Sequence, residues 1–264
     1  MVFLDIMKHI VLFIGCLVTA GARAQAVHWP HHKKAAIVLT YDDALNSQLD
    51  TAVPQLKRAG FKATFFLTGD MDYATIPRWK KLAGEGFELG NHTLYHPCES
   101  ARDNPVSSDN YSKFQLIMEI SVMNHLLYAM DGKTVRTYAY PCAETTVGGK
   151  DYVDSLRTSR EVEFARIGGD QEDAVITDFN RLDSLRVPSL GLEDHTDAAT
   201  IISFIRKVQA AGGLGIIMFH GIGGDYITTA TDVHQAVLDY LNKNRKEIWV
   251  ATFRQAMEYA MSHR

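Results

Sequence analysis

The chain has 264 residues, of which 46% are hydrophobic and 22% charged, and its formal net charge is -4. This length is enough for one α/β domain with a full core. The slightly negative charge gives no support for nucleic-acid binding, which usually needs a basic face.

The N-terminal segment has the pattern of a secretory signal peptide. The basic pair Lys8–His9 precedes an apolar run over 10–18, and an Ala-x-Ala cleavage site ends at Ala24. The run is well short of the roughly 20 apolar residues that a membrane-spanning helix needs. We therefore expect residues 1–24 to be removed from a secreted or periplasmic protein, without stable membrane insertion. A lipoprotein anchored through Cys16 is the minor alternative.

In the remaining chain, short apolar runs alternate with longer amphipathic ones. The apolar runs predict strands at 35–39, 63–67, 87–89, 135–140, 215–219 and 249–252. The amphipathic runs predict helices at 47–58, 77–84, 112–130, 198–210 and 232–242, with a last helix ending at Ser262. In the long helix, the residues near helical spacing are Phe114, Ile117, Met118, Val122, Leu126 and Met130.

This alternation of strand and helix is typical of a mainly parallel sheet flanked by helices. Such a sheet is either open and doubly wound or closed into a TIM-like barrel. Polar residues follow several predicted strands, and a barrel gathers the ends of its strands at one face. No linker or repeat divides the chain. We therefore expect an α/β fold, a distorted (β/α) TIM-like barrel, in one domain over 25–264.

Candidate chemical groups stand at three of these strand ends. Asp42 and Asp43 follow the first strand, where they either cap a helix or serve as a base beside a metal carboxylate. His92 and His96 are spaced to face one metal, and two His with one Asp are a common zinc-type set. Such a pair can also be two unrelated histidines. His220 is either a core histidine or a proton donor, and the Gly-rich segment 221–224 behind it suits a loop at a ligand site.

Two cysteines, Cys98 and Cys142, remain if Cys16 leaves with the signal peptide. The favoured interpretation is a pair of buried free thiols, although export also permits a disulfide between them. Both lie close behind the proposed site, so a disulfide there would brace it.

Four segments together resemble the polysaccharide deacetylase family, also called the NodB-homology domain or carbohydrate esterase family 4. Thr40–Asp43 resembles its Thr-Phe-Asp-Asp motif, and His92–Pro97 resembles its His-Ser/Thr-x-x-His-Pro motif. Lys62–Phe66 resembles its second strand, and Met218–His220 resembles its last motif. The resemblance covers residues 35–221.

The resemblance implies a divalent metal ion, zinc or alternatively cobalt or nickel, held by Asp43, His92 and His96. It implies that Asp42 is the general base and His220 the general acid. The reaction would be hydrolysis of N- or O-acetyl groups on an acetylated glycan.

The resemblance also implies roles for residues around this set. Thr93 would support a ligand histidine. Tyr140, Pro141 and Met218 would contact substrate, and a backbone N–H near Tyr140 would stabilise the oxyanion. Apart from the resemblance, the aromatic residues Tyr73, Tyr95 and Tyr226 could stack on sugar rings, the alternative for each being packing in the core or at its rim.

The chain departs from the family pattern in two places. Ala139 stands where the third motif usually has an Arg, and we hypothesise that Arg166 takes over that role, the alternative being a surface or structural Arg. The Trp of the fourth motif is missing, and the candidates to pair with His220 are Asp170, Asp183 and Asp194. The alternative functions are a hydrolase of a small non-sugar amide and a non-catalytic carbohydrate-binding relative.

Overall fold

A computed structural model describes residues 27–100, 106–168 and 174–264. The predicted signal peptide, Cys16 and Asp170 lie outside the described residues. The strands of the main sheet are β1 (Ala35–Asp42), β2 (Thr64–Leu67), β3 (Glu88–Asn91), β4 (Thr137–Ala139), β7 (Phe164–Arg166), β8 (Val175–Ile176), β9 (Leu190–Gly191), β10 (Leu214–Phe219) and β11 (Ile248–Ala251). A separate hairpin contains β5 (Thr146–Val147) and β6 (Lys150–Asp151).

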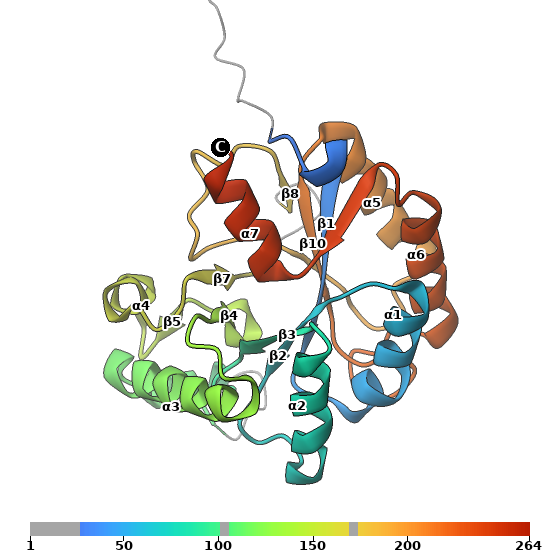
Figure 1. Cartoon of the computed structure of the whole chain (residues 1–264). Helices are drawn as coiled ribbons and strands as arrows, with labels where there is room; N and C mark the ends of the chain where they lie inside the picture. Colours follow the sequence, from blue (N-terminus) through green and yellow to red (C-terminus); the bar gives the residue numbers. More distant parts are fainter. Residues whose placement is uncertain (1–26, 101–105, 169–173) are drawn as a thin grey trace, which may run out of the picture.

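The helices lie around this sheet (Figure 1). They are α1 (Val53–Ala59), α2 (Ile76–Gly84), α3 (Lys113–Asp131), α4 (Val153–Ser159), α5 (Ala198–Ala211), α6 (Thr231–Lys243) and α7 (Phe253–Ser262). The predicted helix over 47–58 begins as a π-helical turn, Gln48–Ala52, and becomes regular only in α1. None of the described helices is both long and apolar enough to cross a membrane.

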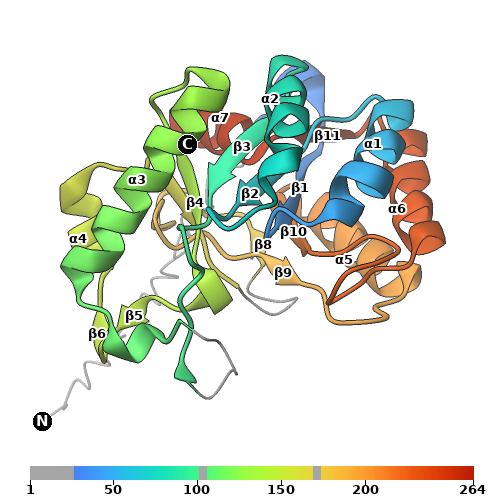
Figure 2. The same ribbon diagram turned by 90° about the horizontal axis from the view of Figure 1, so that it is seen from below.

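The sheet is a distorted, incompletely regular barrel, as the sequence predicts (Figures 1 and 2). Its strand order is β7-β4-β3-β2-β1-β10-β8, and the neighbours from β7 to β10 pair in parallel. The segment 187–191 connects β7 with β10, the two end strands of the parallel part of the sheet. Val187 pairs with Arg166 at the end of β7, and β9 pairs with β10. The carboxyl ends of β1, β3, β7 and β10 therefore surround one face.

Alternate residues of β1 enter two different cores, because side chains of a strand point to opposite faces. Ile37, Leu39 and Tyr41 pack in the core that holds residues of α1, α5 and α6. Ala36 and Val38 pack in a second core with residues of α7. By the same alternation, Asp42 lies on the α7-facing side of β1, which is the inner side of the curled sheet.

The long helix α3 buries a different stripe from the one that the sequence pattern suggested. Phe114, Met118 and Val122 are exposed, by 73%, 46% and 45%. The residues that α3 buries are Leu116, Glu119, Ile120, Met123, Leu127 and Met130. The predicted face was only partly right, since Met130 is buried and Ile117 and Leu126 are partly buried. Both sides of the helix carry large apolar side chains, and one buried position is a Glu whose carboxylate accepts from the Tyr111 hydroxyl.

A buried histidine on α6 is held in its neutral form by its neighbours. His234 is fully buried, with Nε2 2.6 Å from the Tyr41 hydroxyl and Nδ1 against Gln55 Oε1. The Gln55 amide nitrogen donates to the Thr231 carbonyl, so Gln55 Oε1 is an acceptor and Nδ1 carries the proton. Nε2 then accepts from Tyr41. Burial lowers the pKa of His234 from 6.5 to about 3.

This buried histidine predicts acid sensitivity of the fold. Between pH 7 and 5 the unfolded chain takes up a proton at His234 that the folded chain does not. The free energy of unfolding should therefore fall by about 2 kcal/mol from this group as the pH falls. Denaturant unfolding of the wild type and of His234→Gln at pH 7 and pH 5 measures this change in the free energy of unfolding. The variant should be less stable at pH 7, yet lose about 2 kcal/mol less on acidification. An unchanged pH dependence would contradict this assignment.

Candidate active site

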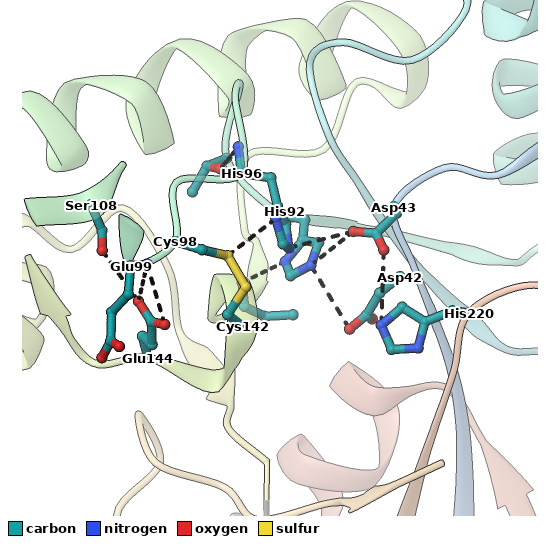
Figure 3. The surroundings of a disulfide bond; sticks show 12 residues. Asp42, Asp43, His92, His96, Cys98, Glu99, Ser108, Cys142, Glu144 and His220 are labelled. Atoms are coloured by element: carbon teal, nitrogen blue, oxygen red, sulfur yellow. Dashed lines mark hydrogen bonds and ion pairs between the residues drawn. A yellow bond between two sulfur atoms is a disulfide. The ribbon is translucent and has the colours of Figure 1, made fainter. Parts of the chain in front are cut away.

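The carboxyl ends of four parallel strands bring the predicted polar groups together. Asp42 ends β1 and Asp43 follows it, His92 follows β3, and His220 follows β10. Arg166 ends β7 on the inner side of the sheet. Figure 3 shows the two aspartates and the histidines His92, His96 and His220 pointing toward one another.

Asp43, His92 and His96 form a compact set of possible metal ligands. Their ligand atoms all lie within 4.8 Å of one another. Asp43 Oδ1 is 3.3 Å from His92 Nε2 and 3.5 Å from His96 Nε2. A tetrahedral zinc ion, with bonds of about 2.0–2.1 Å, places its ligand atoms about 3.3–3.4 Å apart. The three side chains therefore fit a zinc-sized cation that takes one atom from each.

One hydrogen bond orients the His92 imidazole, and another shapes the turn that carries His96. His92 Nδ1 donates to the Ala139 carbonyl at 2.8 Å, which leaves Nε2 as the free lone pair facing Asp43. The His96 N–H donates to Thr93 Oγ1 at 2.9 Å, so Thr93 closes the turn that carries His96. The segment is a turn and not a helix, as Pro97 predicts.

The backbone is strained at this cluster. Asp43, Thr93 and His96 have φ angles of 77°, 66° and 50°. Few residues other than glycine adopt this left-handed region, and such residues cluster at functional sites. The local geometry is thus maintained by the surrounding fold rather than by the preference of each residue.

The charges of the cluster act on one another. Burial alone would raise the pKa of Asp43, but the hydrogen bond and charge of His92 and the charges of His96 and His220 hold it well below its usual range. Burial opposes protonation of His92, but Asp42 and Asp43 raise its pKa overall. Burial and the neighbouring His92 lower the pKa of His96 to about 4. The cluster thus holds an ionised carboxylate and a neutral His96 at neutral pH.

Asp42 is held by a buried arginine. Arg166 is 1% exposed, and its Nη2 donates to Asp42 Oδ2 in a buried ion pair. Asp42 Oδ1 is buried and has no hydrogen-bond partner among the described residues. Arg166 is therefore not a surface residue, and the second oxygen of Asp42 is left for another molecule.

A cavity of about 410 Å³ opens beside these groups. Its lining includes Asp42, His92, His96 and His220, together with Tyr140 and Met218 from the predicted substrate contacts. Pro141 is buried and does not line it. Residues that also line it and were not predicted as site residues are Ala143, Gly168, Gly191, Leu192, Glu193 and Ile227. The acidic and imidazole groups thus face a space that admits a small group such as acetyl.

Part of the chain that carries these groups is similar to known proteins. Residues 30–157 match the family model described as polysaccharide deacetylase. Over these residues, about half of its length, the chain is similar to the polysaccharide deacetylase family. The matched segment carries both predicted metal-site motifs, whereas Arg166 and His220 lie beyond it.

The chain is also similar to two curated proteins and to one solved structure. Gellan lyase of a Bacillus species is 24% identical over 259 residues, which are 90% of this chain and 10% of that protein. Peptidoglycan-N-acetylglucosamine deacetylase of Bacillus cereus is 33% identical over 96 residues, 36% of this chain and 33% of that protein. The family 4 acetyl xylan esterase of Clostridium thermocellum, in complex with a cobalt ion, has 18% identity and a TM-score of 0.56, covering 84% of this chain and 90% of that one. The aligned regions are thus small parts of both curated relatives, and the esterase supports the fold.

Arg166 lies beside the position where the third family motif usually has an Arg. Ala139 replaces the usual Arg on β4, and Ala139 pairs with Arg166 on the adjacent strand β7. The guanidinium therefore reaches Asp42 from the neighbouring strand. This geometry is what the hypothesis for Arg166 requires; its role in turnover stays a prediction.

His220 has a less complete environment. Its Nε2 lies 3.8 Å from Asp43 Oδ2, and its Nδ1 is buried without a hydrogen-bond partner among the described residues. Asp183 pairs with Arg157, and Asp194 accepts from the Thr228 N–H. Neither of these two candidates therefore pairs with His220.

The N–H of Tyr140 is not available to an oxyanion. It donates to the Arg166 carbonyl at 3.2 Å, because β4 and β7 continue their pairing here. The Tyr140 hydroxyl donates to the Leu185 carbonyl at 2.8 Å. Tyr140 therefore supplies a fixed wall of the cavity and no free donor from these two groups.

Cys98 and Cys142 form a disulfide, so the favoured interpretation of free thiols was wrong (Figure 3). Cys98 lies two residues after His96, and its sulfur is 3.6 Å from His96 Nδ1. Cys142 lines the cavity. The bond therefore ties the turn of a predicted metal ligand to the cavity wall. Behind the disulfide, the Glu99 N–H donates to the Glu144 carboxylate at 3.2 Å.

Proposed function

We propose that this protein is a metal-dependent polysaccharide deacetylase, a hydrolase that removes N- or O-linked acetyl groups from a glycan. The observation that carries the proposal is the trio Asp43, His92 and His96, with Oδ1 of Asp42 unpartnered beside it. A non-catalytic binding protein has no need of this base, so the geometry favours an enzyme.

Two imidazoles and one carboxylate suit zinc, and cobalt or nickel are the alternatives. Such an ion would act as a Lewis acid toward the acetyl carbonyl and make a water molecule easier to deprotonate. Because these residues contribute three ligands, positions remain for water and substrate.

The side chains of the protein carry the proton transfers. Asp42 takes a proton from the attacking water through Oδ1, while Arg166 holds Oδ2 and stabilises the negative charge. His220 gives a proton to the departing amine or alcohol. Leu192, Met218 and Ile227 provide an apolar wall for the acetyl methyl group.

The substrate proposal is an acetylated glycan, supported by the names of the relatives, and a small non-sugar amide is the alternative. We further propose that residues 25–264 form the catalytic domain of a secreted or periplasmic protein, on the basis of the N-terminal sequence pattern.

Acetate release tests the proposal. The protein would be incubated with chitin oligomers, peptidoglycan fragments and acetylated xylan, each with zinc, cobalt or nickel and with a chelator. We expect metal-dependent release from one class of glycan. No release from any glycan, with metal binding intact, would refute the glycan deacetylase and favour the small-amide hydrolase or the binding protein.

A further inference from the structure

The two oxygens of Asp43 have different partners. Oδ1 faces His92 and His96, at 3.3 and 3.5 Å from their Nε2 atoms. Oδ2 accepts a hydrogen bond from the Tyr226 hydroxyl and lies 3.8 Å from His220 Nε2. One oxygen is thus directed at the metal position while the other is held away from it.

Tyr226 lies in the Gly-rich loop after β10, and this loop is fixed at several points. Gly221 and Thr229 bond across its base at 2.9 Å, and Gly221 also donates to the Tyr226 carbonyl at 3.3 Å. Asp225 Oδ2 accepts from the N–H of Ser47, in the segment that follows β1, at 2.8 Å. The loop is therefore anchored to the same chain segment that carries Asp43.

The backbone on both sides of Tyr226 is strained. Asp225 has a φ of 62° and Ile227 a φ of 45°. A β-branched residue with positive φ is a genuine outlier, and such conformations cost on the order of 1–3 kcal/mol. In this conformation Tyr226 lines the cavity, with its ring centroid 5.8 Å from that of His220. Its hydroxyl donates a hydrogen bond to the Asp43 carboxylate.

We propose that Tyr226 is a positioning residue for the metal carboxylate. By holding Oδ2 of Asp43, its hydroxyl makes the carboxylate present Oδ1 alone to the cation. One-oxygen binding leaves more positions free for water and the acetyl carbonyl than two-oxygen binding does. The inference rests on the proposed function only in taking Asp43 as a metal ligand.

Metal binding by Tyr226→Phe tests this role without any substrate. The variant keeps the ring and loses the hydroxyl. Loss of a group that orients a metal ligand typically weakens binding by roughly 10–100-fold, and we expect a loss of that size for zinc. Calorimetric titration of stripped protein measures it. Tyr73→Phe is the matched control, because Tyr73 is 85% exposed and does not line the cavity; it should bind zinc as the wild type does.

A cobalt titration reports on the coordination itself. We expect the visible absorption spectrum of the cobalt-loaded Tyr226→Phe protein to differ from that of the wild type, because the second oxygen of Asp43 becomes free to bind. A purely structural role for Tyr226 would not change this spectrum. Asp225→Gly, which tolerates the positive φ but removes the anchor to Ser47, should also weaken zinc binding, and it provides a second test if Tyr226→Phe folds poorly.

The outcomes separate this inference from the proposed function. If the wild type binds no divalent metal, the proposed function fails. If the wild type binds zinc and Tyr226→Phe binds it equally well, with an unchanged cobalt spectrum, the positioning role is refuted and the proposed function stands.

Discussion

Replacing Asp42 with asparagine is expected to lower turnover by roughly 10²–10⁴-fold, the usual contribution of a general base. The amide oxygen can still accept from Arg166, so the fold should tolerate the change, but the side chain can no longer take a proton from water. Turnover would be measured as acetate release at saturating metal. Zinc affinity should stay within a few-fold of the wild type, because Asp43 and the histidines are intact.

Asp183→Asn is the control for Asp42→Asn. Asp183 also pairs with an arginine, Arg157, but on the surface, where side-chain exposures are 35% and 49%. This control should keep wild-type turnover. Retention of most activity in Asp42→Asn would show that another group removes the proton.

Replacing Arg166 with alanine is expected to damage both stability and turnover. Removal of one partner of a buried ion pair costs about 3–5 kcal/mol, because the other charge is left buried and alone. An arginine with 1% exposure cannot be removed without a cost in stability. We expect turnover of the remaining folded enzyme to fall by roughly 10–100-fold, since Asp42 loses its orientation.

A second buried ion pair provides the control for Arg166. Arg136 forms an ion pair with Asp131, and the two side chains are 1% and 2% exposed. Arg136 directly precedes β4, at the end of that strand away from the cavity. Arg136→Ala should lose a similar amount of unfolding free energy, measured with denaturant, yet keep the turnover of its folded fraction. Equal turnover in the two variants would mean that Arg166 is only structural. Arg166→Lys, which keeps the charge, should recover part of both losses.

The candidate site residues could be grouped from the sequence because they follow strand ends. Apolar runs predict strands, and the polar residues that end them, such as Asp42 and His220, must meet when parallel strands curl into a barrel. The link from Arg166 to Asp42 was a hypothesis from the missing Arg at position 139, and the pairing of β4 with β7 supplies its geometry.

Other features depend on tertiary packing and could not be read from the pattern. The helix α3 has apolar side chains on more than one face, so spacing did not reveal which stripe is buried. Pairing of Cys98 with Cys142 depends on two loops meeting at a Cα separation of 6.0 Å. The approach of Tyr226 to Asp43 depends on left-handed residues in a loop, and aromatic exposure alone did not distinguish it from Tyr73 or Tyr95.

The most direct test of the account is a metal titration of activity. Protein stripped of metal would receive zinc in steps below one equivalent per chain, and acetate release from the best acetylated glycan would be followed. The account predicts no release without metal and a linear rise that stops at one equivalent, and it predicts that His92→Ala removes this rise. Equal release by the stripped protein, or a rise that survives in His92→Ala, would contradict the assignment of Asp43, His92 and His96 as the centre of the reaction.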